Sequence, residues 1–378
     1  AESYGWGWLN LLSSIGGFVM TIGFALFVLD ILLQARFGPK TGRNPWGAAS
    51  LEWATPIPPT DYGFASIPTV TSHRQLADDP DLPRKLAAGD GLLGFARRNW
   101  LETIAVDMIT GEPRQIVLLP GRTFLPLLTA LATGLFFVSL LLQVYPLAIA
   151  GLVITIAMFW LWTRHPARTA DLGRLPVGDG TTLPVHTESG QAPSWWAVVF
   201  LLLADAALFG SLLFGLVFLW VVAPGWPPPE VLSDSTPFSL IAMACLVAAA
   251  GLGRLALRAA RRGAVGWALV WNRFLAAAHA ATVLLLAAIL TTAPDPTAHA
   301  YAGVTAAILV YVLVHAAVGL ILALHVWQAC RRGHVSAARS LDLMIGRLWH
   351  DYTAVAGVIG LGTILDVAAM IGQPGAGG

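Results

Sequence analysis

The sequence predicts an all-α membrane protein with eight transmembrane helices, and three observations support this fold class. Of the 378 residues, 56% are hydrophobic and 11% are charged, whereas an ordinary soluble domain has about 25% charged residues. Eight apolar stretches approach or exceed the roughly 20 residues that a spanning helix needs. All 22 Lys and Arg residues can be placed on one side of a membrane, as expected when cationic loops stay cytoplasmic.

The eight predicted spans follow one another along almost the whole chain. They cover residues 8–35, 123–143, 145–163, 195–222, 237–259, 265–291, 301–329 and 350–371. Most of them are too apolar on all sides to be surface helices in water. Tyr145-Pro146 divides one apolar run that, as a single helix of about 40 residues, would be roughly 60 Å long, twice the hydrocarbon core.

The distribution of cations predicts the orientation of the chain. Lys and Arg occur in alternate connections, and the connections 223–236 and 292–300 contain none. We therefore expect a multi-pass protein of the bacterial inner membrane with both termini on the periplasmic side. Arg254 and Arg258, near the end of the span 237–259, are assigned to the connection that follows it, which leaves Arg273 as the one cation within a helix, about 12 Å from the cationic end. It could hold a lipid phosphate or a carboxylate there, or reach the interface by snorkelling.

The chain is expected to have three parts: a first helix over 1–43, a cytoplasmic connecting segment over 44–121, and a helical domain over 122–378. The connecting segment is long enough to be a functional insertion or a linker. Its prolines exclude a continuous helix at its beginning. Trp46 and Trp53 are large aromatics in a polar loop, so we expect them to anchor it against an apolar surface.

Composition also excludes several classes of function. A net charge of +1 gives no reason to expect a nucleic-acid partner. Cys245 and Cys330 form no CxxC pair or His/Cys cluster, so neither a disulfide framework nor a metal site is expected. The chain begins with Ala1-Glu2-Ser3 and has no initiator Met and no basic region there. This beginning is therefore not a signal peptide. We expect a processed chain or the tail of a longer polypeptide.

Ionisable residues within the predicted spans are the candidate functional groups. Asp205 lies near the middle of its helix, where a charged Asp costs about 2.5–3.5 kcal/mol. It either controls lipid binding or proton supply, or is a protonated or hydrogen-bonded carboxyl in a helix contact. His315 lies at the centre of its helix with Tyr311 on the same face. His315 and His279 are expected to be packing histidines, and His350, at a helix terminus, to be structural.

A cluster after the first helix carries a family resemblance. Asn44-Pro45-Trp46, Leu51-Glu52-Trp53 and the prolines that follow resemble the segment after the last core helix of haem-copper oxidase subunit I. The first helix, with its Gly-Trp-Gly-Trp-Leu-Asn entry over residues 5–10, is similar to the twelfth helix of that subunit.

The remaining seven helices resemble subunit III of the same oxidases. Trp226-Pro227 stands where the family has a Trp-Pro-Pro turn, and Trp349-His350 stands where its last helix opens with Tyr-Trp-His. Asp205 stands where the family has a buried glutamate. Ala204-Asp205 replaces the usual Ser-Glu, and Asp351-Tyr352-Thr353 replaces the usual Phe-Val-Asp, so this half is a divergent member.

The resemblance implies the C-terminal part of a fused subunit I/III polypeptide of cytochrome c oxidase. Its partners would be a haem-bearing subunit I core, a copper-bearing subunit II, cytochrome c as electron donor, and phospholipids. The subunit III module of the family splits into two plus five helices, with lipids in the cleft, and supports proton uptake. The His-Pro-Glu-Val-Tyr motif of the redox core is absent from the sequence. We therefore expect no catalytic residue, metal ligand or directly bound cofactor in this chain, with haems and copper in partner subunits.

Two alternatives are kept. A quinol oxidase has the same Asn-Pro-Trp pattern, and only the copper ligands of a separate subunit II distinguish it. A standalone transporter usually shows repeats or broken helices around a midplane site, and the sequence shows no convincing repeat.

Overall fold

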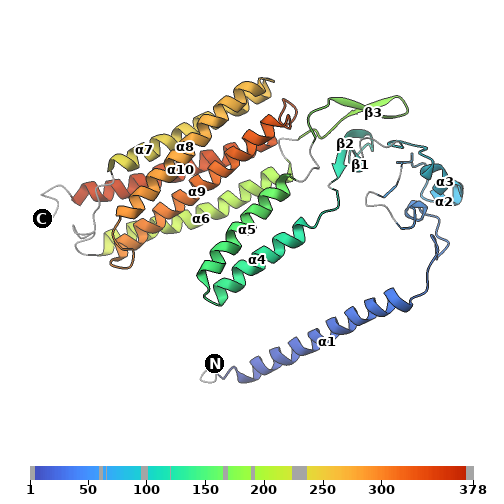
Figure 1. Ribbon diagram of the computed structural model, residues 1–378, viewed down its shortest axis with the longest axis horizontal. Coiled ribbons are helices and arrows are strands. Elements are labelled where there is room, and N and C mark those ends of the chain that lie inside the picture. The colour runs from blue at the N-terminus through green and yellow to red at the C-terminus, as the bar shows by residue number, and fades with distance from the viewer. Residues whose placement is uncertain are drawn as a thin grey trace. The chain divides into compact units, whose positions relative to one another are not determined.

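A computed structural model describes residues 5–58, 63–64, 66–94, 101–119, 121–164, 169–188, 192–223 and 236–371. The chain divides into two compact units, 1–98 and 99–378, which are described separately here (Figure 1). The connecting segment expected over 44–121 contributes to both units. Trp226 and Pro227, the expected Trp-Pro-Pro turn, lie outside the described residues.

The first unit begins with the long apolar helix α1, Gly7–Phe37, none of whose residues is buried. Short helices follow: η2, Leu51–Ala54; α2, Gln75–Asp78; and α3, Leu82–Ala87. Ala54, Leu82 and Leu86 form a small core between them. Buried Ser66 fastens this core, because its hydroxyl donates to the carbonyl oxygens of Leu86, at 3.0 Å, and Asp90, at 2.8 Å.

The Asn-Pro-Trp segment closes on itself. The Asn44 side chain donates to the Ala48 carbonyl at 2.7 Å and accepts from the Ala48 N–H at 2.9 Å. Trp46 meets Trp53 edge to face, with ring centroids 5.1 Å apart. Trp46 is nevertheless 77% exposed, so its partner within the described part of this unit is one aromatic ring rather than an apolar surface. Pro45 lies in the same turn, and Glu52 is exposed in η2.

The second unit contains two β-hairpins outside its helices, which the sequence analysis did not predict. Strand β1, Leu101–Val106, pairs antiparallel with β2, Pro113–Leu119. Strand β3, Arg174–Gly178, pairs antiparallel with β4, Thr181–Pro184. A parallel bridge between Ile116 and Val185 joins the two hairpins, and both side chains are buried.

Local chemistry explains both hairpin turns. Asp179-Gly180 connects β3 to β4 with positive φ at both residues, the backbone that a two-residue hairpin turn requires. In the β1–β2 turn, the backbone N–H groups of Thr110 and Ile109 hold the pKa of the Asp107 carboxyl well below its usual range, because they donate to its charged form.

Seven helices complete the second unit, so all eight predicted helices are found and the all-α class is confirmed. They are α4, Leu125–Leu141; α5, Tyr145–Arg164; α6, Pro193–Val222; α7, Thr236–Arg261; α8, Val265–Thr292; α9, Ala300–Arg331; and α10, Leu341–Ile371. Among the described residues, six helices (α1 and α5 to α9) are long and apolar enough to cross a membrane, and α4 is apolar but shorter. The chain is thus a polytopic membrane protein.

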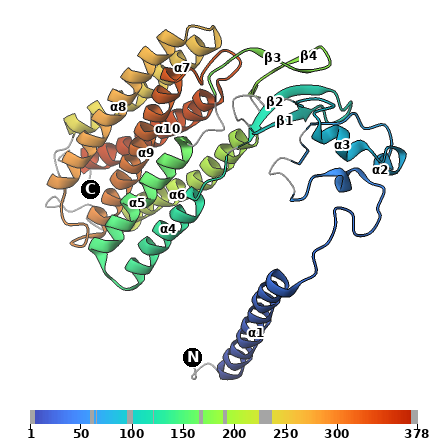
Figure 2. The ribbon, with the colours of Figure 1, turned by 45° about the vertical axis from the view of Figure 1, so that its right-hand side comes forward.

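Helices α4 and α5 form a hairpin, whereas α6 to α10 form a bundle (Figure 2). Gly151 allows the close approach within the hairpin, since a Cβ there would meet the Phe136 backbone nitrogen at 2.8 Å. The bundle encloses an apolar core that includes Leu246, Leu286 and Val312. The seven helices of this unit thus group as two plus five.

Two expectations about helix interiors are wrong. Helix α10 begins at Leu341 rather than at 350, so Trp349 and His350 lie inside it and His350 is not terminal. A window of apolar residues marks the part in the membrane, whereas the charged first turns of a helix fall outside that window. Arg273 is also not the one cation within a helix, because others lie inside helix bounds: Arg254, Arg258, Arg261, Arg331 and Arg347.

Candidate functional site

A polar cluster lies in the middle of the five-helix bundle, where α6, α9 and α10 meet. Asp205 of α6 faces Tyr311 and His315 of α9 and Tyr352 of α10. Asp205 lies within three residues of the middle of α6, and His315 lies at the middle of α9. The cluster is therefore far from both helix ends, at a depth where an isolated charge is costly.

The Asp205 carboxylate oxygen Oδ2 is the centre of the cluster. The Tyr311 hydroxyl donates to it, and the Tyr352 hydroxyl lies 2.6 Å away. His315 Nε2 lies 3.0 Å from the same oxygen. The two tyrosine hydroxyl oxygens are themselves 2.6 Å apart. Three side chains from two other helices thus converge on one carboxylate oxygen.

Hydrogen-bond accounting sets a condition on a hydrogen bond between Asp205 and His315. His315 Nδ1 lies 2.8 Å from the Tyr311 backbone carbonyl oxygen, which can only accept, so Nδ1 must carry the hydrogen. In a neutral imidazole the other nitrogen, Nε2, is then an acceptor. An ionised carboxylate is also an acceptor only. Contact between Nε2 and Oδ2 therefore requires one more proton, carried by the carboxyl or by the imidazole.

Aromatic packing fixes the orientation of these groups. The His315 ring stacks on Trp349, with centroids 5.1 Å apart and planes 11° apart. Trp349 Nε1 donates to the His315 carbonyl oxygen at 3.0 Å. Phe209, one turn from Asp205 on α6, stacks on Tyr311 at 5.1 Å. The Asp205–His315 pair is thus packed against aromatic rings from all three helices.

A second buried pair lies one turn of α9 away. His279 Nε2 of α8 and His350 Nδ1 of α10 are 2.9 Å apart, and both side chains are buried. A Cβ at Gly319, one turn after His315, would meet the His279 ring at 2.6 Å. Glycine at that position therefore makes room for the imidazole. Two neutral imidazoles, one donating and one accepting, satisfy this contact without an added proton.

The other ionisable candidates lie elsewhere. Arg273 is exposed on α8 and makes no ion pair within the described part of the chain. His325 lies further along α9 than His315, and its Nε2 is 3.6 Å from Asp342 Oδ2 of α10. Among the described residues, no three His, Cys, Asp or Glu side chains lie close enough together to hold a metal ion.

Sequence reasoning selected Asp205, His315, His350 and Trp349 but missed Tyr352. The face shared by Tyr311 and His315 is confirmed. His315 packs on Trp349, and its Nε2 also lies 3.0 Å from Asp205 Oδ2, a contact that the packing interpretation did not include. Tyr352 follows Trp349 by three residues, so the helical period placed it within reach of the same face. The signal was present but was hidden by the expectation that α10 opens at this motif.

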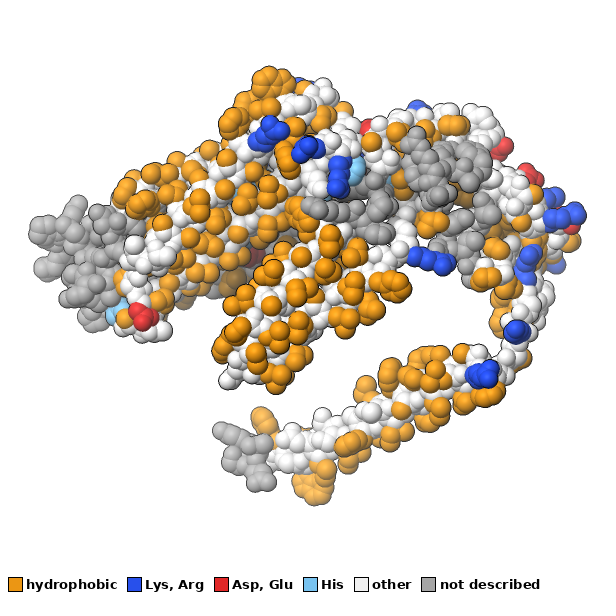
Figure 3. All heavy atoms as spheres, in the orientation of Figure 1, with side chains coloured by type: hydrophobic (Ala, Val, Ile, Leu, Met, Phe, Trp, Pro, Cys, Tyr) orange, Lys and Arg blue, Asp and Glu red, His pale blue; other side chains and the backbone are white. Residues whose placement is uncertain are grey.

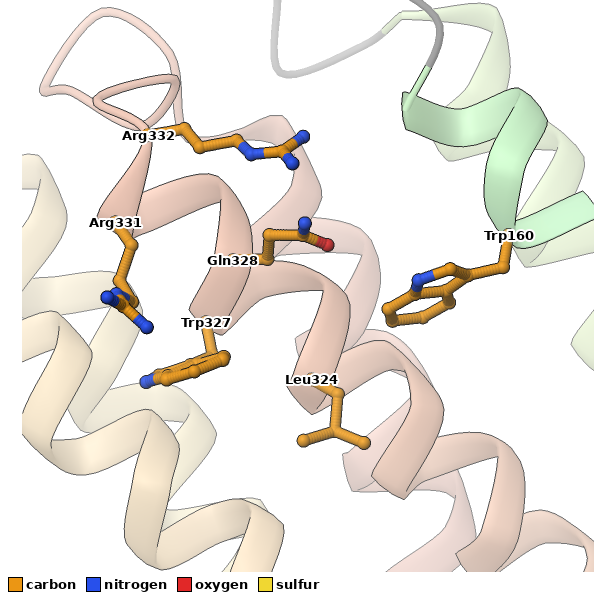
Figure 4. A pocket seen from close by; sticks show the side chains of 6 residues that line it. All are labelled: Trp160, Leu324, Trp327, Gln328, Arg331 and Arg332. Atoms are coloured by element: carbon orange, nitrogen blue, oxygen red, sulfur yellow. The ribbon is translucent and has the colours of Figure 1, made fainter. Parts of the chain in front are cut away.

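A cavity of about 430 Å³ lies between α5 and α9. Trp160 of α5 points toward the α9 face formed by Leu324, Gln328 and Arg332, as Figure 4 shows. The Arg331 guanidinium lies over the Trp327 ring, 4.9 Å from its centroid. The cavity has an apolar wall and cationic groups at one end, which suits an amphipathic ligand.

Fold and cluster define a class: a polytopic membrane protein with a partly buried carboxylate at the contact of three helices. Comparison relates it to a particular oxidase subunit. The chain is 34% identical over 129 residues to cytochrome c oxidase subunit 1 of Alkalihalophilus pseudofirmus, covering 34% of this chain and 17% of that protein. It is 29% identical over 167 residues to cytochrome c oxidase subunit 1 of Bacillus sp. (strain PS3), covering 42% and 23%.

A third relative is the putative cytochrome c oxidase subunit 1-beta of Streptomyces coelicolor, 39% identical over 80 residues, with coverage of 20% and 14%. No protein-family model matches the chain. The chain spans less than a quarter of the length of each of these relatives. The matches support a relationship to the haem-copper oxidases through cytochrome c oxidase subunit 1.

Proposed function

We propose that this chain is the non-redox membrane part of a proton-pumping cytochrome c oxidase complex, in which oxygen is reduced to water. In this proposal α1 is the last helix of subunit I, and residues 122–378 form a subunit III-like module. Haems and copper belong to the partner subunits, a subunit I core and a subunit II, and cytochrome c donates electrons to the complex. The chain lies in a bacterial inner membrane with its basic loops in the cytoplasm.

The exposed surface of α1 is the observation that carries this proposal. The relatives are oxidase subunits, and α1 is a 31-residue apolar helix without a buried residue. Figure 3 shows hydrophobic side chains along this helix. An apolar helix without packing partners in its own unit suits a helix that completes the bundle of another polypeptide.

Purification of the tagged chain from its own membranes tests the assignment. We expect haem absorption bands to co-purify with a larger polypeptide, together with a copper-containing subunit. A haem complex without that copper would instead support a quinol oxidase. A colourless, stable, isolated chain would contradict the proposal. An intact mass of the haem-bearing polypeptide would test whether it is covalently continuous with this chain.

The proposed role of the polar cluster is to hold a proton within the subunit III-like module and so support proton uptake by the complex. Asp205 and His315 together require one proton more than an ionised carboxylate and a neutral imidazole contain. A carboxyl placed in this way can release and regain that proton without moving a helix, because its partners come from rigid, packed elements.

Two substitutions separate proton holding from packing. Asp205→Asn keeps the shape but cannot release the proton; because all three partners meet Oδ2, the amide keeps the tyrosine contacts if its oxygen takes that position, or the His315 contact if its nitrogen does. Asp205→Ala removes both the proton and the contacts. If the proton matters, both variants should keep normal haem content while turnover falls or inactivation during turnover rises. A normal turnover lifetime for Asp205→Asn at several pH values would reject the proton role.

Phospholipid binding in the cleft between the two helix groups is part of the same proposal. The cavity between α5 and α9 combines Trp160 and Leu324 with Arg331 and Arg332, as an acyl chain and a phosphate would require. Trp160→Ala should lower the amount of phospholipid that co-purifies with the complex, as measured by mass spectrometry. Unchanged lipid content would remove this part of the proposal.

A further inference from the structure

The seam between α7 and α10 carries an unusual group of exposed arginines. Arg254 and Arg258 of α7 lie one turn apart on one exposed face, with Arg261 a further turn along. Arg347 of α10 lies opposite them, because Asp351 contacts it and Arg254 at once. Figure 3 shows Lys and Arg side chains at one end of an otherwise largely hydrophobic bundle surface.

Specific contacts hold these side chains over the seam. One oxygen of Asp351 lies 3.1 Å from Arg254 Nη2, and the other lies 3.4 Å from Arg347 Nε. Arg261 Nη2 lies 3.1 Å from the Met344 sulfur of α10. Neither Arg254 nor Arg347 makes a hydrogen bond within the described part of the chain, and Arg347 Nε is buried without one. Their guanidinium groups are thus placed by ion pairs with Asp351, but their donors are not used in hydrogen bonds.

The seam has a large excess of positive charge. Arg254 and Arg347 contact the one carboxylate of the seam, Asp351, and Arg258 and Arg261 follow Arg254 along α7, so these four arginines and one carboxylate sum to a net charge of +3. Helix α7 contains no Asp or Glu. Of the other acids of α10, Asp342 lies beside His325 of α9, and Asp366 is about 22 Å further along the helix. Another anion is needed to balance the seam.

The depth of the seam distinguishes it from an ordinary charged loop. Arg254 lies seven residues before the end of α7, and Arg347 lies six residues after the start of α10. These separations correspond to about 10 Å of helix. Arg347 precedes the apolar stretch of α10, which begins near 350, and Arg254 lies near the end of the apolar stretch of α7. Both positions suit the headgroup region of a bilayer, where a cation can meet lipid phosphates.

We propose that the α7–α10 seam is a binding site for an anionic phospholipid of the leaflet on the cationic side. The phosphodiester would lie between the guanidiniums of Arg254 and Arg347, whose planar forks suit phosphate oxygens, with Arg258 and Arg261 along the headgroup. Basic pockets between transmembrane helices are established sites for such headgroups. This site is on a different helix pair from the α5–α9 cavity and does not rest on the proposed oxidase function.

The test uses the delipidated protein, in whatever complex it purifies, in detergent with added phosphatidylglycerol or phosphatidylcholine. Phosphatidylglycerol should raise the thermal unfolding temperature at lower concentration than phosphatidylcholine, and native mass spectrometry should count the bound lipid. Arg254→Gln should raise the half-saturating phosphatidylglycerol concentration about five-fold, and the double variant with Arg347→Gln about thirty-fold.

Arg36→Gln is the control, because Arg36 is also an exposed arginine near the end of a long apolar helix but is not on the seam. Its response to phosphatidylglycerol should equal that of the unchanged protein. Should the double variant fail to fold, Asp351→Asn keeps all four cations and should bind phosphatidylglycerol at least as tightly as the unchanged protein. Equal responses to the two lipids, or equal losses in Arg36→Gln and the double variant, would overturn the site. A double variant that loses an acidic protein subunit from its complex while its lipid binding stays unchanged would also overturn it.

Discussion

Two buried polar clusters lie one helical turn apart in the same bundle, yet their hydrogen-bonding requirements differ. In the Asp205–His315 pair, His315 Nε2 and Asp205 Oδ2 are both acceptors unless a proton is added to one of them. The His279–His350 pair is satisfied by two neutral rings. The difference follows from what the second nitrogen of each histidine meets: a backbone carbonyl fixes the tautomer of His315, whereas His279 Nδ1 has no partner within the described residues. The neighbours of a buried histidine, and not burial alone, thus decide whether its hydrogen bonds need an added proton.

The largest expected loss of stability comes from filling the space beside the His279–His350 pair. Gly319→Ala places a methyl group 2.6 Å from the His279 ring, so the ring must move and its contact with His350 must stretch. Overpacking of this kind costs about 1–3 kcal/mol. Thermal or denaturant unfolding of the purified chain in detergent should show this loss.

The control for that variant is Gly362→Ala in α10, where nothing lies within 4 Å of the new Cβ. Alanine favours helix by up to about 1 kcal/mol over glycine, so this control should be neutral or slightly more stable. Equal losses for Gly319→Ala and Gly362→Ala would show that the His279 contact is not what limits the space at 319.

The next effect separates the two clusters by their protons. Asp205→Ala leaves His315 Nε2 and two tyrosine hydroxyls without their common partner, which should cost about 1–2 kcal/mol. Asp205→Asn should cost less, since whichever amide atom takes the Oδ2 position keeps part of these contacts. Infrared spectroscopy adds a direct measurement: a protonated Asp205 gives a carboxyl C=O band that Asp205→Asn removes.

His315→Gln would sharpen the assignment of that proton. If the proton resides on the carboxyl, the C=O band should persist in this variant, and if it resides on the imidazole the unchanged protein should show a carboxylate band instead. Equal destabilisation by Asp205→Ala and Asp205→Asn would contradict the hydrogen-bond accounting.

The sequence predicted the helices well because their signal is local. Apolar runs long enough to span a membrane located all eight helices, and six meet a strict criterion of length and hydropathy. The sequence analysis missed the two β-hairpins, although their signals are also local. Asp179-Gly180 is a hairpin turn pair, and the apolar alternation of β2 ends in the buried residues Ile116 and Leu118. Both signals were overlooked within segments treated as connections.

The site was predictable only in its members, not in their pairing. Asp205 and His315 were selected because each is ionisable within an apolar span, which one helix shows by itself. Their contact depends on the rotation of α6 against α9, over a sequence separation of 110 residues. No period within either helix specifies that rotation. Tyr352 also required the correct start of α10, which the apolar window placed nine residues too late.

A smaller effect is expected from Tyr352→Phe. This change removes one of the three side chains that meet Asp205 Oδ2 but leaves Tyr311 and His315 in place. A single side-chain hydrogen bond within a membrane bundle is worth about 0.6–1 kcal/mol. Unfolding of the detergent-purified chain should show a loss of that size. A loss as large as that of Asp205→Ala would mean that Tyr352 carries the cluster alone.

The smallest effect is the coupling within the neutral pair, measured by a double-mutant cycle of His279→Leu and His350→Leu. Each single change removes the 2.9 Å contact and leaves the other imidazole without its partner, so the double variant should be less destabilised than the sum of the singles. The coupling should be about 0.6 kcal/mol, the average for interhelical hydrogen bonds in a membrane protein. Because no added proton is shared, this coupling should stay constant over the pH range in which both rings remain neutral. A coupling that grows as pH falls, while the chain stays folded, would show that the second pair also takes up a proton, and the distinction between the two clusters would then be lost.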